Sequence, residues 1–124
     1  MESILTSIKK LLGIEEDYEQ FDPDIIMHIN TVFALLKRMG VGPSKGFSIQ
    51  DAETVWDDFL GEDPNIILEA VRTYIYLKVR MIFDPPTSSA VIEAIKENIK
   101  ELEWSLNFEA DAMAGCEEVK IQNG

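Results

Sequence analysis

The 124-residue chain has one cysteine, Cys116, and one histidine, His28. A lone cysteine cannot form an internal disulfide, and Cys116 lies in a polar segment without a nearby histidine, which argues against a thiol nucleophile. A lone histidine excludes the zinc motifs that pair two histidines. His28 falls at the edge of an apolar helical stripe, which favours a partly buried structural role. No apolar run reaches the roughly 18 residues of a membrane span, so we expect no membrane insertion.

Positive charge is scarce, because 11 basic residues stand against 23 acidic ones and the net charge is -12. Such an excess opposes the phosphate neutralisation on which binding to the DNA backbone depends. The acid is also clustered: Glu15–Asp24 contains six acidic residues and no basic one. A surface of this kind either keeps the protein soluble or repels or imitates DNA. An acidic DNA mimic that inhibits a host nucleic-acid-binding protein is therefore one alternative function.

Recognisable cofactor and catalytic motifs are also missing. The glycine-rich segment Gly40–Gly46 is not a phosphate-binding P-loop, because Lys45 stands where that motif needs its second glycine. The carboxylates on either side of Gly61 lack the oxygen spacing of a calcium loop. Nothing marks out one pair of carboxylates for acid-base catalysis. We expect no enzyme, no cofactor and no metal.

Helical periodicity is what the sequence has in abundance. Apolar residues recur at spacings of three and four, and each stripe is bounded by capping residues, proline or glycine. The predicted helices span about 4–12, 23–39, 52–60, 64–83 and 89–108. The signals that bound them are Gly13 at the end of the first, Asp22-Pro23 at the start of the second, Ser48 and Asp51 for the third, Asp63-Pro64 for the fourth and Ser88 for the fifth. The fold class is therefore all-α, a compact bundle of about five helices (1–108). A flexible C-terminal tail (109–124) is expected to follow.

The fourth predicted helix is the most apolar. Its residues share one broad arc that includes Ile82, so other helices must surround it. Only a narrow strip, with Tyr76 and Arg80 near its C-terminal end, is expected to face water. Asp84 should end the helix, because Pro85-Pro86 cannot continue it.

The last predicted helix carries two aromatic side chains on its polar face. Trp104 and Phe108 lie roughly opposite the apolar stripe, so a monomer would leave both in water, unless neighbouring helices sandwich this helix and bury both faces. An exposed aromatic pair indicates a contact surface. The Gly40–Gly46 loop is expected to be exposed and to reach partners. The predicted interface residues are Trp104, Phe108, Tyr76, Arg80, Gly42 and Lys45.

Several segments, in this order and spacing, are similar to a known family. They are Leu12-Gly13-Ile14, Phe21–Asn30, Gly40-Val41-Gly42, Trp56 with Phe59-Leu60, Tyr74–Pro86, and Glu101–Trp104 with Leu106-Asn107. Over about residues 4 to 108 the chain resembles the head-to-tail connector, or adaptor, proteins of tailed bacteriophages and their prophages.

The resemblance implies a small helical subunit that works in the neck of the virion and is present in the host cytoplasm before assembly. Copies would form a ring below the portal protein, extend the DNA channel and give a stopper or tail-completion protein its docking surface. DNA would pass through without specific binding, and no cofactor or chemistry is implied. A closed ring needs two different contact surfaces on each subunit. A host cytosolic helical adaptor is a further alternative.

Overall fold

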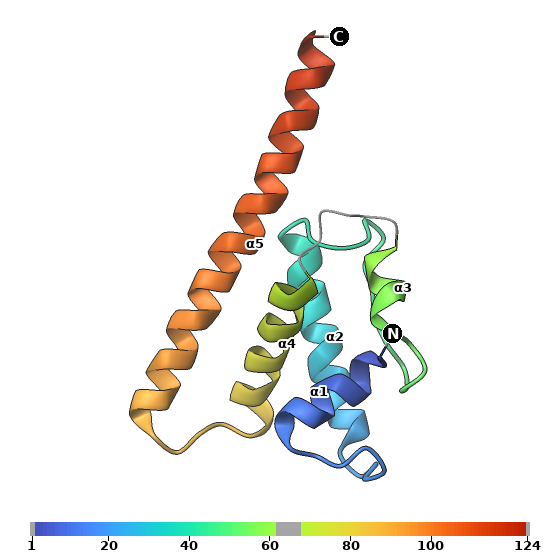
Figure 1. The fold of residues 1–124 in the computed structure, drawn as a ribbon, viewed down its shortest axis with the longest axis vertical. Coiled ribbons are helices and arrows are strands. Elements are labelled where there is room, and N and C mark those ends of the chain that lie inside the picture. The colour runs from blue at the N-terminus through green and yellow to red at the C-terminus, as the bar shows by residue number, and fades with distance from the viewer. Residues whose placement is uncertain (1, 62–67, 124) are drawn as a thin grey trace.

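The computed structural model describes the backbone of residues 2–61 and 68–123 and the side chains of residues 2–61 and 68–108. Within these ranges the chain forms five α-helices and no named strand, which confirms the all-α prediction. Figure 1 shows α4 between α2 on one side and α5 on the other, with α1 across the lower part. The helices are α1 (Ile4–Leu12), α2 (Asp22–Arg38), α3 (Trp56–Leu60), α4 (Leu68–Phe83) and α5 (Ser89–Asn123).

Helix α1 begins and ends as its sequence indicates. The Ser3 hydroxyl accepts a hydrogen bond from the backbone N–H of Thr6, and Gly13 ends the helix with a left-handed φ of 82°. For α2, Asp22 was expected to be the capping residue. The structure instead places Phe21 at the cap and Asp22 in the first turn, where the Asp22 carboxylate pairs with Lys9.

Helix α3 is shorter than predicted, since it begins at Trp56 and not at residue 52. Non-local contacts hold the preceding segment extended: a β-bridge joins Ser3 to Val55, and the backbone N–H of Ile4 donates to Thr54 O at 3.0 Å. The capping signal read from Ser48 and Asp51 was therefore wrong. The Asp51 carboxylate accepts from Glu53 N–H in a local turn.

Helix α4 is the central helix, as predicted, and packs against α1, α2 and α5. It ends at Phe83 just before the proline corner, while its expected start at Asp63-Pro64 lies outside the described residues. Its buried side chains are Val71, Tyr74, Ile75, Leu77 and Val79. The prediction that Ile82 is buried was wrong, because its side chain is 58% exposed. Ile82 lies in the last turn of α4, just before the proline corner.

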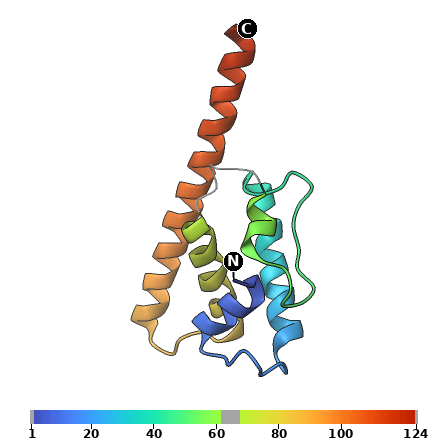
Figure 2. The ribbon, with the colours of Figure 1, turned by 45° about the vertical axis from the view of Figure 1, so that its right-hand side comes forward.

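Helix α5 begins after Ser88, whose hydroxyl accepts the backbone N–H of Val91 at 3.4 Å, as its sequence indicated. The α5 backbone stays helical to Asn123 and extends beyond the other helices (Figures 1 and 2). The division at residues 108 and 109, and the flexibility of the segment after it, stay predictions. Cys116 lies in the part of α5 whose side chains are not described.

Candidate functional site

Trp104 and Phe108 form the most exposed aromatic surface among the described residues. Their side chains are 68% and 55% exposed, so the prediction that both face outward is confirmed. The two rings stack with centroids 5.3 Å apart and an interplanar angle of 14°. We call these two residues the aromatic pair. It presents a flat apolar surface that no other part of the described chain covers.

The opposite face of α5 fixes the direction of the aromatic pair. Leu106 is only 3% exposed and belongs to the hydrophobic core. Glu103 accepts a 2.8 Å hydrogen bond from the hydroxyl of Tyr74 on α4. Desolvation of the phenol raises the pKa of Tyr74 above its ordinary value, and the hydrogen bond and charge of Glu103 raise it further. These contacts clamp one side of α5 against α4, so the pair points away from the bundle.

Tyr76 and Arg80 were predicted to lie on a water-facing strip of α4, but both are half-buried. Arg80 Nη1 donates a 2.8 Å hydrogen bond to the Tyr76 hydroxyl, one helical turn away. Much of their polar surface is therefore used within the molecule. Their role at an interface stays a prediction.

The loop after α2 was predicted to be exposed, and it is exposed only in part, because Gly42 is half-buried. Gly42 has a φ of +95°, and a Cβ atom there would lie 2.6 Å from Phe59 Cε1. The close approach of the Phe59 ring therefore explains why a residue without a side chain stands at position 42. Lys45 is exposed. An interface role for Gly42 and Lys45 stays a prediction.

The side chain of Asn30 holds the other end of this loop. Asn30 Oδ1 accepts the backbone N–H of Ile49 at 2.7 Å, and Asn30 Nδ2 donates to Ile49 O at 2.9 Å. Two hydrogen bonds to one residue imitate the pairing of a β-ladder. They fix the connection between α2 and α3 to the side of α2.

The segment between α1 and α2 packs around the side chain of Lys9. Sequence patterns did not predict this role for Lys9. Its side chain is 2% exposed, and its Nζ donates to Glu16 O at 2.9 Å and to Tyr18 O at 2.7 Å. Nζ also lies 2.9 Å from Asp22 Oδ1. Burial of a lysine requires such compensation, which the acidic segment around it supplies. The six carboxylates of Glu15–Asp24 were the signal in the sequence for a cation bound among them.

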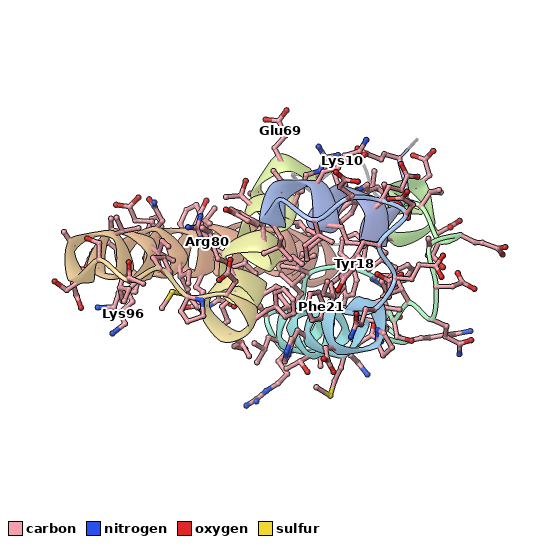
Figure 3. All side chains as sticks on the ribbon, turned by 90° about the horizontal axis from the view of Figure 1, so that it is seen from below. Lys10, Tyr18, Phe21, Glu69, Arg80 and Lys96 are labelled. Atoms are coloured by element: carbon pink, nitrogen blue, oxygen red, sulfur yellow. The ribbon has the colours of Figure 1, made fainter. Side chains whose placement is uncertain are left out.

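An apolar hollow lies beside this lysine. It has a volume of about 440 Å³ and is lined by Gly13, Ile14, Glu15, Asp17, Tyr18 and Phe21. The Phe21 ring packs against Tyr18 at 5.5 Å and against Phe83 at 5.2 Å, which joins the loop to the end of α4. Figure 3 shows Tyr18 and Phe21 together, well apart from Lys96 on α5. The rim of the hollow carries negative charge.

A second outward surface lies on α2. Met27 is 57% exposed, and Thr31, Ala34 and Arg38 on the same side of the helix are exposed as well. We call these four residues the α2 outer strip. Their spacing of three and four residues, opposite the buried stripe of Ile25, Ile29, Val32 and Leu36, was a signal in the sequence. The whole segment from Ile25 to Gln50 contains no acidic residue.

Among the described residues, no group of three or more His, Cys, Asp or Glu side chains is arranged to hold a metal ion. The same residues include no helix that combines the length and the apolar character needed to cross a bilayer.

Comparison with protein families shows which family the chain belongs to. The family model described as phage connector protein matches residues 4–113, most of the chain. The chain belongs to the phage connector protein family. No curated protein and no solved structure matches it. The role of this connector is structural, in the joining of phage head and tail, and the family assignment favours it over a DNA mimic or a host adaptor.

Proposed function

We propose that copies of this connector form a ring below the portal protein, join the phage head to the tail and extend the DNA channel. The observation that carries the proposal is the aromatic pair, which is exposed in the monomer and belongs to a chain of the phage connector family. Stacked aromatic rings held on a rigid helix are typical anchors of protein interfaces. They cost little conformational entropy when they are covered, because the stack is already formed.

The charge of the chain supports passage of DNA without adhesion. A net charge of -12 for each copy gives a ring a strongly negative surface. A negative wall repels phosphates and offers few cations for them to bind. The same charge makes the copies repel one another, so assembly needs local contacts that outweigh the repulsion. The portal protein and a stopper or tail-completion protein are the proposed partners above and below the ring.

The test is static light scattering of the purified protein over a concentration series, with and without portal protein. We expect a discrete assembly of many copies, formed either by the connector alone or on the portal. Because screening weakens the repulsion between like charges, moderate salt should favour assembly of the connector alone. A chain that remains monomeric under every condition and does not bind portal would overturn the proposal.

A further inference from the structure

We propose that the α2 outer strip of one copy receives the aromatic pair of the next copy. The inference rests on the proposed ring and names the two surfaces that meet in it. The ring requires a heterologous contact, in which each subunit offers two different surfaces. The aromatic pair and the α2 outer strip are on different helices, and α4 separates them (Figure 1).

The two surfaces have matching apolar character. On α2, Ala34 leaves a flat position between Met27, about two turns before it, and Arg38, about one turn after it. A flat aromatic stack can approach a helix closely at a small residue. Methionine adapts its shape to an aromatic ring, and a guanidinium group binds its face. Met27 and Ala34 would then pack against the rings, while Arg38 would lie over Trp104.

Their charges are complementary. The outward face of α5 near the aromatic pair carries two exposed carboxylates, Glu97 and Glu101, and one exposed lysine, Lys100. Glu97 lies 3.8 Å from Lys100, an exposed pair of little energetic value. The facing end of α2 carries Lys37 and Arg38 and no carboxylate. Contact between these faces brings acid to base in a chain whose copies otherwise repel one another.

The apolar hollow beside Tyr18 and Phe21 is a less favourable binding surface for the aromatic pair than the α2 outer strip. Its rim carries Glu15 and Asp17, which would face the carboxylates of α5. Like charges across an interface oppose binding. The α2 outer strip avoids this repulsion.

The two surfaces also lie at similar levels along the axis of the bundle. Helices α2 and α5 run in the same direction, and α2 ends at the same end of the bundle where α4 begins (Figures 1 and 2). Glu103 of α5 accepts the hydrogen bond of Tyr74, which lies in the first half of α4. Trp104, the next residue, therefore lies beside the half of α4 that is nearer the end of the bundle at which α2 ends. Two copies side by side, related by rotation about an axis along the helices, would bring these levels together.

A charge exchange within one chain tests the pairing. The variants are Arg38→Glu, Glu101→Arg and the double variant Arg38→Glu/Glu101→Arg, with Lys10→Glu on α1 as a control that changes net charge as Arg38→Glu does. The readout is the concentration of half-assembly by light scattering, in the presence of portal protein if the wild type needs it. Urea unfolding checks that each variant stays folded, which the exposure of both positions favours.

We expect each single variant to raise the half-assembly concentration about tenfold or more, and the double variant to return it to within about threefold of wild type. The Lys10→Glu control should stay near wild type. Assembly of the single variants at the wild-type concentration, or a double variant no better than either single one, would overturn the inference and leave the ring itself in place. Contact with portal alone, without contact between copies, would also overturn it. Absence of any wild-type assembly would overturn both the inference and the proposed function.

Discussion

The hydroxyl of Tyr74 donates a 2.8 Å hydrogen bond to Oε2 of Glu103 and so joins the central helix α4 to α5. Glu103 and Trp104 are consecutive, and successive residues of an α-helix point about 100° apart. A Glu103 side chain held toward α4 therefore turns Trp104 away from the bundle. The exposure of the aromatic pair therefore follows from the attachment of α5 to α4 through Glu103. The same hydrogen bond makes the stability of the connector depend on pH.

We expect the stability that the Tyr74–Glu103 contact contributes to the folded connector to be lost at alkaline pH. Burial raises the pKa of Tyr74, so the folded protein keeps the phenol proton at a pH where the unfolded chain, with a pKa of about 10, loses it. The stabilisation is complete below that pH and falls as the pH rises above it. Urea unfolding at about pH 9 and about pH 11 should show a steeper loss of unfolding free energy in wild type than in Tyr74→Phe.

At neutral pH, Tyr74→Phe should lower the free energy of unfolding by about 1 kcal/mol, because the half-buried Glu103 carboxylate loses a donor. Tyr18→Phe removes an exposed hydroxyl and is the matched control. Equal alkaline slopes for wild type and Tyr74→Phe would show that this phenol is not protected.

The buried cation of Lys9 should be the most sensitive polar position of the fold. Lys9→Met keeps the aliphatic stem but leaves Asp22 and the carbonyls of Glu16 and Tyr18 without their donor. Loss of one partner of a buried ion pair costs about 3 kcal/mol or more. Urea unfolding should show this loss, and the segment between α1 and α2 should become more sensitive to protease.

Lys10 offers the control for this variant. Its ion pair with Glu2 has the same 2.9 Å distance as that of Lys9 with Asp22, but the Lys10 side chain is 61% exposed. Lys10→Met should leave the free energy of unfolding close to that of wild type, because an exposed ion pair contributes little. Similar losses for the two methionine variants would mean that burial is not what gives Lys9 its importance.

Gly42 and Gly13 separate the effect of crowding from the effect of backbone conformation. Both have positive φ, but a Cβ at Gly42 would meet the Phe59 ring at 2.6 Å, whereas no atom lies within 4 Å of one at Gly13. Gly42→Ala should therefore cost about 2 kcal/mol more than Gly13→Ala in urea unfolding, because it adds overpacking to the same strain. A Gly42→Ala variant of normal stability that fails to assemble would instead support the interface role predicted for Gly42.

The features that the sequence predicted are those that local rules determine. The stop at Gly13, the start after Ser88 and the end of α4 before Pro85 each depend on a few neighbouring residues. The exposure of Trp104 follows from its angle on a single helix. Helical period and capping were therefore sufficient for the fold class and for the aromatic pair.

The features that it did not predict depend on residues far apart in the chain. The hydrogen bonds of Asn30 to Ile49 and the bridge from Ser3 to Val55 override the local capping signal at Ser48 and shorten α3. A lysine at position 9 looks like an ordinary surface residue until the loop folds over it. Sequence periodicity says which residues share a face, but not which face another segment covers.

The most direct test of the account is the Trp104→Ala variant, measured by light scattering for assembly and by urea unfolding for stability. The account predicts assembly weaker by about 2 kcal/mol per contact, with an unfolding midpoint close to wild type, because the side chain is largely exposed in the monomer. Ile82→Ala removes another exposed apolar side chain, outside the aromatic pair, and should leave assembly unchanged. Wild-type assembly by Trp104→Ala, or loss of its fold, would contradict the claim that Trp104 is an assembly anchor.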